Sequence, residues 1–352
     1  MSSKPPDTPA DRRRLQMADI ARLAGVSMST VSRALNGSTL VNEETRRRIG
    51  ELARSLNYTI NESAKNLRLQ RNQTIAVVVP YDAQSRQHIS DPFFLAMVGS
   101  LADALTDRGY DMLLSRVDAE ALDSVSSLYD VGRAIGIVLI GQWRHHDQLN
   151  ALAARGVPVV VWGGQLPQQL YCTVGGDNEL GGRLATRHLL DHGRRRILFL
   201  GDAQLPEVAL RLDGYRRALA EVGVSFDEAL VHTVPFEEQG AVRAIDAVLA
   251  AGAEHFDAVF ACSDLLAILA MRALRRAGRR VPDDVAVIGY DDIALAAYAE
   301  PPLSTIHQPV ALAGVELVDA LTRLIGGEPQ APRQLPVNLV VRHSSSTGLA
   351  SR

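Results

Sequence analysis

The sequence predicts an α/β protein in which a small helical module precedes a large core of parallel β-sheets in doubly wound layers. Residues 15–58 carry helical patterns and no strand pattern, whereas from residue 74 onwards short apolar runs alternate with helical patterns. Runs of this kind fit strands buried on both faces. They are found at 75–79, 135–140, 157–162, 197–200, 258–262 and 285–288. The core has about 280 residues, so we expect two lobes with a cleft between them.

Composition shifts along the chain predict its domain boundaries. We expect a disordered tail over 1–14, a helical module over 15–60, a hinge and linker over 61–73, a two-lobed core over 74–342 and a tail over 343–352.

The overall composition is that of a globular protein, with 47% hydrophobic and 22% charged residues. No uncharged apolar stretch is long enough to span a membrane, so no membrane partner is expected. The basic run at 12–14 is not followed by an apolar segment, which excludes a typical signal peptide. Cys172 and Cys262 lie far apart in apolar surroundings. We therefore expect buried thiols and a cytoplasmic location.

Charge is unevenly distributed along the chain. Residues 1–72 contain 13 Lys and Arg against 7 Asp and Glu, a net charge of +6, while the remainder carries −9. A basic N-terminal module on an acidic body suits a protein whose first part binds phosphates and whose second part avoids nucleic acid.

The N-terminal module has the spacing of a helix-turn-helix. One apolar stripe predicts a first helix, at Met17, Ile20, Ala21 and Ala24. Gly25 suits a left-handed turn, and Ser27 suits the N-cap of a second helix. That helix buries Val31, Ala34 and Leu35 and leaves a short polar outer face at Met28, Ser29, Ser32 and Arg33. Any amphipathic pair of helices has similar spacing, so this pattern alone leaves both interpretations open.

A third helix is predicted after Asn42, which is a suitable N-cap with Glu43 and Glu44 in the first turn. Its buried stripe is expected at Ile49, Leu52, Ala53 and Leu56. The arginines at 46–48 would form an outer turn. They either face DNA phosphates or are simply a solvated face.

The stretch 19–36, DIARLAGVSMSTVSRALN, resembles the start of the LacI/GalR (lactose-repressor) family, and EETR at 43–46 and LNY at 56–58 extend the match. The resemblance runs from about residue 15 to 342 and implies a head that binds operator DNA. By this resemblance Met28, Ser29 and Arg33 would contact base edges, with arginine against guanine the expected pairing. Phosphates would be contacted by Gln16, Thr30, Ser32 and Asn36.

Residues 61–69 predict a short hinge helix that is too short to be stable alone in water. In similar repressors this segment folds on operator DNA, and a leucine wedges into the minor groove. The matching residue is Leu67. A plain linker is the alternative, and Ile60 stands where the family often has proline.

The core resembles periplasmic sugar-binding proteins, which share this family's two-lobed fold. The matching segments are DPFF at 91–94 after the first strand, VGGDN at 174–178 opening a helix, RLDGY at 211–215 at a helix start, and GYDD at 289–292 followed by PPLSTI at 301–306.

A sugar site needs carboxylates and guanidinium groups for hydroxyls and an aromatic face for stacking. The resemblance assigns Arg211 and Asp291 as the principal effector-contacting pair, and the alternative is a structural ion pair across the cleft. Phe94 and Trp162 would stack on the effector or belong to the core. Four further residues would line the walls: Asp91, Asp177, Ser263 and Gln308. Asp177 could instead cap a helix, and Gly163 stands where the family often has an acidic residue.

Together these features predict a transcriptional regulator, in the family's usual role of repressor, that binds a near-palindromic operator as a homodimer. A small molecule in the cleft, a carbohydrate rather than a purine, would control operator affinity. We expect no cofactor and no metal site, and His145-His146 is expected in a solvated loop.

Two other classes of protein fit the sequence less well. An enzyme on a doubly wound sheet would need a nucleotide-binding or nucleophile motif, and the sequence has no G-x-G-x-x-G after the first strand, no phosphate loop and no G-x-S-x-G. A transport solute-binding protein would need an export signal and no DNA-reading head. We therefore expect a regulator that is not an enzyme.

Overall fold

The computed structural model describes residues 17–35, 38, 40–56, 72–81, 88–236, 238–252 and 256–346. The chain divides into two compact units, residues 1–72 and 73–352. Several predicted features lie outside the described residues: the tail at 1–14, Gln16, Asn36, the hinge helix with Leu67, and the last six residues.

The first unit is the predicted helical module, formed by α1 (Met17–Ala24), α2 (Met28–Leu35) and α3 (Glu43–Ser55). Gly25 has φ of 65° between α1 and α2, a conformation that glycine adopts without strain. Asn42 caps α3, and its side chain accepts a hydrogen bond from the backbone N–H of Thr45 at 2.8 Å. The turn and the cap therefore lie where the sequence predicts them.

The interior of this module is small and entirely apolar. Ile20, Val31 and Ile49, one from each helix, are completely buried against one another. Ala21 is also buried, and its small side chain allows α1 and α2 to approach closely. The predicted stripes pack in this cluster, but five of their residues are only partly buried at its edge: Met17, Ala24, Leu35, Leu52 and Leu56.

The second unit begins with the N-terminal lobe, a sheet of six described strands in the order β11-β5-β4-β3-β1-β2. Its strands are β1 (Thr74–Tyr81), β2 (Asp111–Asp118), β3 (Gly136–Ile140), β4 (Val159–Trp162), β5 (Cys172–Gly176) and β11 (Arg333–Leu335). Its helices are α5 (Pro92–Thr106), η1 (Ala119–Val125), α6 (Ser126–Asp130), α7 (His146–Ala154) and α13 (Val310–Ile325).

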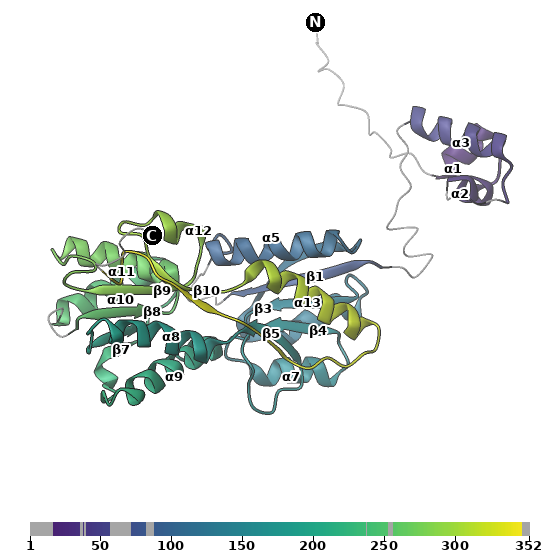
Figure 1. Cartoon of the computed structure of the whole chain (residues 1–352). Coiled ribbons are helices and arrows are strands. Elements are labelled where there is room, and N and C mark those ends of the chain that lie inside the picture. The colour runs from purple at the N-terminus through teal and green to yellow at the C-terminus, as the bar shows by residue number, and fades with distance from the viewer. Residues whose placement is uncertain are drawn as a thin grey trace, which may run out of the picture. The chain divides into compact units, whose positions relative to one another are not determined.

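Both faces of this sheet are covered, as the continuous apolar runs predict. Ile75, Val77 and Val79 of β1 pack with α5 and α13, whereas Ala76 and Val78 pack with η1 and α7. Successive side chains of a strand point to opposite faces, so a strand between two helical layers must be apolar throughout. Figure 1 shows α5 and α13 flanking this lobe's strands.

The C-terminal lobe repeats this architecture, with six described strands in the order β12-β10-β9-β8-β6-β7. Its strands are β6 (Ile197–Leu200), β7 (Val231–His232), β8 (Ala258–Ala261), β9 (Ala286–Asp291), β10 (Ser304–His307) and β12 (Asn338–Val340). Its helices are α8 (Asn178–Asp191), α9 (Pro206–Glu221), η2 (Glu228–Leu230), α10 (Glu238–Gly252), α11 (Asp264–Arg276) and α12 (Ala294–Tyr298). The pairing is parallel, as predicted, except between β10 and β12, which pair antiparallel at the edge of the sheet.

The chain passes between the lobes three times within the described residues. The crossings are from β5 to α8, from β10 to α13 and from β11 to β12. Asp177 lies at the first crossing and Gln308 at the second. Each sheet therefore contains strands from distant parts of the sequence, and the crossing segments join the two lobes.

Each of the six predicted runs forms a strand, but two boundaries differ from prediction. Arg211 lies in the middle of α9, not at a helix start. Ser344 and Ser345, assigned to a C-terminal tail, are buried, and the Ser344 hydroxyl donates a hydrogen bond to the carbonyl of Val287 at 2.6 Å. The core therefore extends beyond Arg342.

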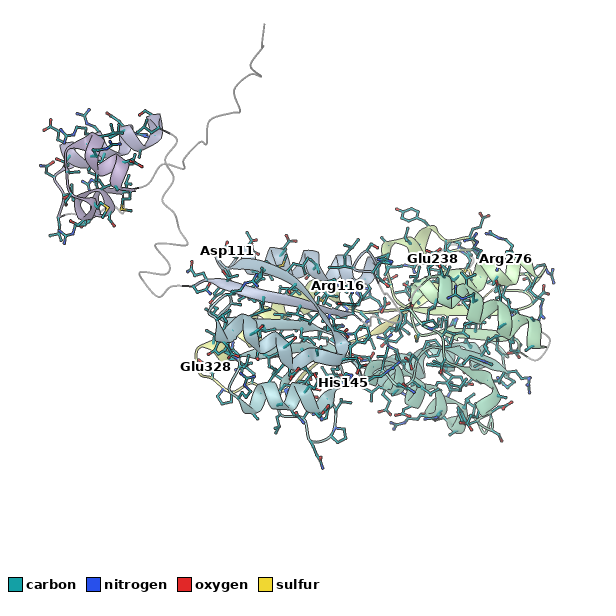
Figure 2. All side chains as sticks on the ribbon, turned by 180° about the vertical axis from the view of Figure 1, so that it is seen from behind. Asp111, Arg116, His145, Glu238, Arg276 and Glu328 are labelled. Atoms are coloured by element: carbon teal, nitrogen blue, oxygen red, sulfur yellow. The ribbon has the colours of Figure 1, made fainter. Side chains whose placement is uncertain are left out.

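Charged side chains cover the outside of the core. Asp111, Glu238, Arg276 and Glu328 are exposed and lie around its periphery in Figure 2. In the described part of the chain, no helix combines the length and apolar character needed to cross a membrane.

Candidate DNA-binding surface and effector cleft

The outer face of α2 is the candidate base-reading surface. Met28 is 49% exposed, and Ser29 and Arg33 are also exposed, whereas Thr30 and Ser32 are half-buried. The Ser27 hydroxyl accepts a hydrogen bond from the Thr30 N–H at 3.1 Å, which fixes the start of α2 as its N-cap. The helix therefore presents a short face with one flexible cation, a form suited to the major groove.

The arginine run on α3 divides into different environments. The Arg48 guanidinium donates to the carbonyl of Ala24 at 3.1 Å and so ties α3 to the end of α1. A cation at a helix C-terminus interacts favourably with its carbonyls. Arg47 is exposed. Arg48 therefore has a contact within the module, and the interpretation of the run as a phosphate-facing turn stays a prediction.

A cleft in the second unit brings together residues from both lobes, with an empty volume of about 690 Å³ that includes space open to solvent. Its lining consists of Asp91, Phe93, Phe94, Ile140, Gly141, Trp143, Trp162, Leu205, Glu207, Val208, Arg211, Phe236, Ser263, Asp291 and Gln308. Several of these residues end a strand or follow one directly, as expected for ligand sites in parallel α/β sheets.

Arg211 is the cation of the cleft, and protein contacts fix its position. Its Nε donates to Asn178 Oδ1 at 2.9 Å, and its Nη1 donates to the carbonyl of Cys262 at 2.5 Å. Its guanidinium carbon lies 3.7 Å from the centroid of the Tyr290 ring. No ion pair joins it to Asp291 in the described structure, and both residues belong to the C-terminal lobe, so a structural ion pair across the cleft is not formed.

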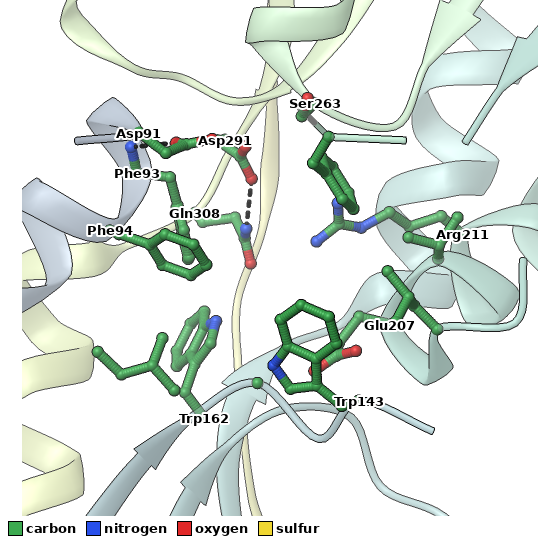
Figure 3. A pocket seen from close by; sticks show the side chains of 15 residues that line it. Asp91, Phe93, Phe94, Trp143, Trp162, Glu207, Arg211, Ser263, Asp291 and Gln308 are labelled. Carbon is green, nitrogen blue, oxygen red and sulfur yellow. Dashed lines mark hydrogen bonds between the residues drawn. The ribbon is translucent and has the colours of Figure 1, made fainter. Parts of the chain in front are cut away.

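Asp291 lies opposite Arg211 at the end of β9 and has φ of 110°, a conformation that is strained for a residue other than glycine. Its Oδ1 accepts a hydrogen bond from the Gln308 amide at 2.7 Å (Figure 3). Burial raises the pKa of Asp291 to about 7 against the opposing effect of Arg211, and the charge of Asp91 raises it further. The backbone strain and the buried charge are both unfavourable, which is typical of a functional site.

The other side of the cleft is aromatic. Trp143 and Trp162 lie together in Figure 3 with Phe94 beside them, and the Phe93 ring centroid is 6.3 Å from that of Trp162. The sequence contains two tryptophans, and both line this cleft. Aromatic faces stack on the apolar faces of sugar rings, while the polar residues opposite can bind hydroxyl groups.

The loop after β3 connects the two lobes at the rim of the cleft. The Gln142 N–H donates to Glu207 Oε1 at 3.1 Å, and Arg144 pairs with Asp202 at 2.5 Å. Gln142 and Arg144 belong to the N-terminal lobe, and their partners belong to the C-terminal lobe. Between them Trp143 has φ of 52° and faces the cavity. One loop thus supplies both an aromatic wall and contacts between the lobes.

Gly163, the departure from the family's usual acidic residue, has a structural explanation. A Cβ at Gly163 would lie 2.5 Å from the Gln142 Cγ. The Gln142 amide is buried and bonds both the carbonyl and the N–H of Gly164 at 2.8 Å. Gln142 therefore fills the space that a larger residue at position 163 would need.

Seven of the eight residues predicted for effector binding line the cleft. Asp177 is the exception, because its side chain accepts a hydrogen bond from the Leu180 N–H at 2.9 Å and caps α8. The prediction missed Trp143, Phe93 and Glu207. Trp143 follows the run at 135–140, and this carboxyl-end position is a usable signal. Nothing distinguishes Glu207 from an ordinary acidic residue at a helix start.

The prediction for His145-His146 is wrong in part. His146 begins α7, and its Nδ1 lies 2.9 Å from the Tyr171 hydroxyl within hydrogen-bonding distance. His145 approaches Glu120 at 3.2 Å. Both histidines therefore have partners, and the expectation of a loop is wrong for His146, whereas His145 lies half-buried in the loop before α7.

Comparison with known proteins agrees with both halves of this description. Residues 16–61 match the model of bacterial regulatory proteins of the lacI family, and residues 186–345 match a periplasmic binding protein-like domain. The chain is 38% identical to the HTH-type transcriptional regulator CelR of Thermobifida fusca over 95% of its own length and 99% of that protein.

Solved structures give the same result. A CelR–cellobiose complex is 35% identical with a TM-score of 0.69, covering 94% of this chain and all of that one. A lac repressor dimer bound to operator and the anti-inducer ONPF is 26% identical with a TM-score of 0.82, covering 95% of this chain and 99% of that one. The chain therefore belongs to the lacI family of bacterial regulatory proteins and is a DNA-binding transcriptional regulator.

Proposed function

We propose that this regulator is a cytoplasmic repressor that binds a near-palindromic operator as a homodimer. When a carbohydrate binds in the cleft, the protein's affinity for the operator either falls or rises. The observation that carries the effector assignment is the arrangement of the cleft. Trp143 and Trp162 face a polar edge formed by Arg211 and Asp291 (Figure 3). Hydroxyl-bonding groups opposite stacking faces are what a sugar ring requires.

The two sets of residues belong to different lobes, and this suggests how a ligand could change operator affinity. Phe94, Trp143 and Trp162 come from the N-terminal lobe, and Arg211 and Asp291 come from the C-terminal lobe. A ligand that contacts both sets binds best at one separation of the lobes. Its differential affinity for the two lobe arrangements then limits how far operator affinity can change.

The homodimer is supported by apolar side chains left on the surface of the core. Leu295 and Tyr298 on α12 are 51% and 86% exposed. Tyrosine is enriched at protein interfaces, so this exposed pair is a candidate dimer contact. A twofold dimer would carry two heads, which matches a near-palindromic site.

Tryptophan fluorescence tests the effector assignment directly, because both tryptophans lie in the cleft. The test titrates the full chain with cellobiose, which is bound by the similar CelR in its solved complex, and with glucose and ribose. A saturable change with at least one sugar supports the proposal. No change with any of them, by fluorescence and by calorimetry, would contradict it.

A pair of matched variants makes the test specific. Asp91 and Asp177 both cap helices through their side chains, but only Asp91 lines the cleft. Asparagine caps a helix about as well as aspartate. Asp91→Asn should weaken sugar binding, and Asp177→Asn should leave it unchanged. An operator sequence is then selected from a pool of DNA duplexes. Fluorescence anisotropy with this operator measures whether the same sugar changes the protein's affinity for DNA.

A further inference from the structure

The charges that line the cleft are unbalanced. Asp91, Glu207 and Asp291 contribute carboxylates, whereas Arg211 contributes the single guanidinium among the described lining residues. Those residues include no lysine and no histidine. A ligand entering this site therefore meets more carboxyl groups than cations among the described lining residues.

Arg211 cannot easily offset that excess for an anionic ligand. Its Nε donates to Asn178 and its Nη1 donates to the Cys262 carbonyl, so Nη2 is the nitrogen without a protein acceptor in the described structure. One guanidinium face is stacked on the Tyr290 ring. Strong phosphate binding by arginine uses two parallel N–H bonds from one edge, and each such edge here includes a nitrogen already in use.

The carboxylates, in contrast, retain capacity to accept hydrogen bonds. Asp291 accepts one from Gln308, and Glu207 accepts one from the Gln142 N–H. A carboxylate has about four acceptor positions, so each can accept more from ligand hydroxyls. Burial raises the pKa of Glu207, as it does that of Asp291, so this part of the cleft disfavours ionised groups.

We infer that the cleft selects uncharged carbohydrates and excludes their phosphorylated and uronic acid forms, so that the effector is a free sugar and not a sugar phosphate. This inference rests on the proposed function, because it specifies the charge of the carbohydrate bound there. The aromatic faces and Arg211 bind the sugar ring, and the carboxyl groups of Asp91, Glu207 and Asp291 disfavour a negatively charged substituent on it.

Matched ligand pairs test this inference. The full chain is titrated by tryptophan fluorescence and calorimetry with cellobiose, cellobiose 6-phosphate and 6-O-acetylcellobiose, and with glucose and ribose beside their phosphates and glucuronate. We expect each phosphate to bind roughly 100-fold more weakly than its parent sugar. The acetyl ester is a neutral substituent at the same oxygen, so it measures steric exclusion separately from charge.

Isosteric variants identify the source of the discrimination. Asp91→Asn and Glu207→Gln keep their helix-cap and backbone hydrogen-bond acceptors but remove a charge. Each should reduce the ratio of phosphate to parent dissociation constants roughly tenfold. Asp177→Asn, outside the cleft lining, should leave that ratio unchanged.

The outcomes separate this inference from the proposal on which it rests. A phosphate that binds as tightly as its parent sugar overturns the charge selection and leaves the carbohydrate site intact. Equal loss with the acetyl ester and the phosphate also overturns it, because size would then be the cause. If no sugar, neutral or charged, binds, the proposed function fails and the inference fails with it.

Discussion

Replacing Asp291 by asparagine should stabilise the protein while it impairs the effector response. Burial raises the pKa of this carboxyl from 3.8 to about 7, so its charge is disfavoured in the folded state. Three pKa units correspond to about 4 kcal/mol, a difference that already includes the attraction of Arg211. Asparagine can still accept the hydrogen bond from Gln308 and tolerates positive φ. We therefore expect Asp291→Asn to increase the free energy of unfolding by about 2–4 kcal/mol at pH 8.

The pH dependence gives the sign of this effect. A carboxyl whose folded pKa is raised binds more protons in the folded state between pH 4 and pH 7, so its contribution to stability is lost as pH rises through 7. The asparagine variant has no such loss. Its advantage in urea unfolding should therefore be near zero at pH 4, grow between pH 4 and 7 and stay constant above that range.

The adjacent residue provides the control. Asp292 accepts a hydrogen bond from Arg342 at 2.7 Å and faces His307 at 3.0 Å, so its charge is paired. Asp292→Asn should destabilise the core by about 1–3 kcal/mol at pH 8, the opposite sign. If Asp291→Asn were destabilising at pH 8, or its gain were the same at pH 4 and pH 8, the reasoning about the buried charge would be refuted.

Three further predictions concern the DNA-binding head, the dimer and the rim of the cleft. Arg33→Ala should cost about 1–3 kcal/mol of operator affinity and relax sequence preference at one position in a duplex selection, whereas Arg47→Ala should weaken all sequences alike and reduce the salt dependence. Tyr298→Asp should shift the protein from dimer to monomer in sedimentation, and an unchanged dimer would place the interface elsewhere. Arg144→Ala and Asp202→Asn should show a coupling energy of about 1 kcal/mol in a double-mutant cycle on unfolding, because solvent weakens an ion pair whose arginine side chain is 43% exposed. Additive effects would show that the pair contributes nothing to stability.

The predicted strands are those that have helices on both faces. The run at 258–262 forms β8 and is completely buried, so its residues are continuously apolar and easy to recognise. Strand β2 lies at the edge of its sheet and none of its residues is fully buried, which weakens its pattern. Strand β10 is buried yet polar, because the Ser304 and Thr305 hydroxyls have partners in Arg342 and Asp264. Such partners come from distant residues, which no local pattern indicates.

The residues of the cleft could be predicted where the resemblance to the LacI/GalR family assigns them. Other lining residues were much harder to predict. Arg211 and Asp291 carry that assignment, and both line the cleft. Glu207 lines it too, but only the packing of α9 against the loop after β3 brings its carboxylate to the Gln142 N–H. Asp177 shows the reverse case, because an acidic residue before a helix satisfies the local capping rule without contributing to the cleft.

The charge of the cleft and the movement of the lobes are connected by the same side chains. Glu207 both lines the cavity and bonds the loop of the other lobe, so a ligand that competes for its carboxylate also changes a contact between the lobes. Trp143 lies between this bond and the Arg144–Asp202 pair, in the strained conformation that the two contacts maintain. The chain enters the N-terminal lobe at Thr74, immediately after the first unit. A rearrangement at this rim would therefore displace the N-terminal lobe, which is the first lobe to follow the DNA-binding unit along the chain.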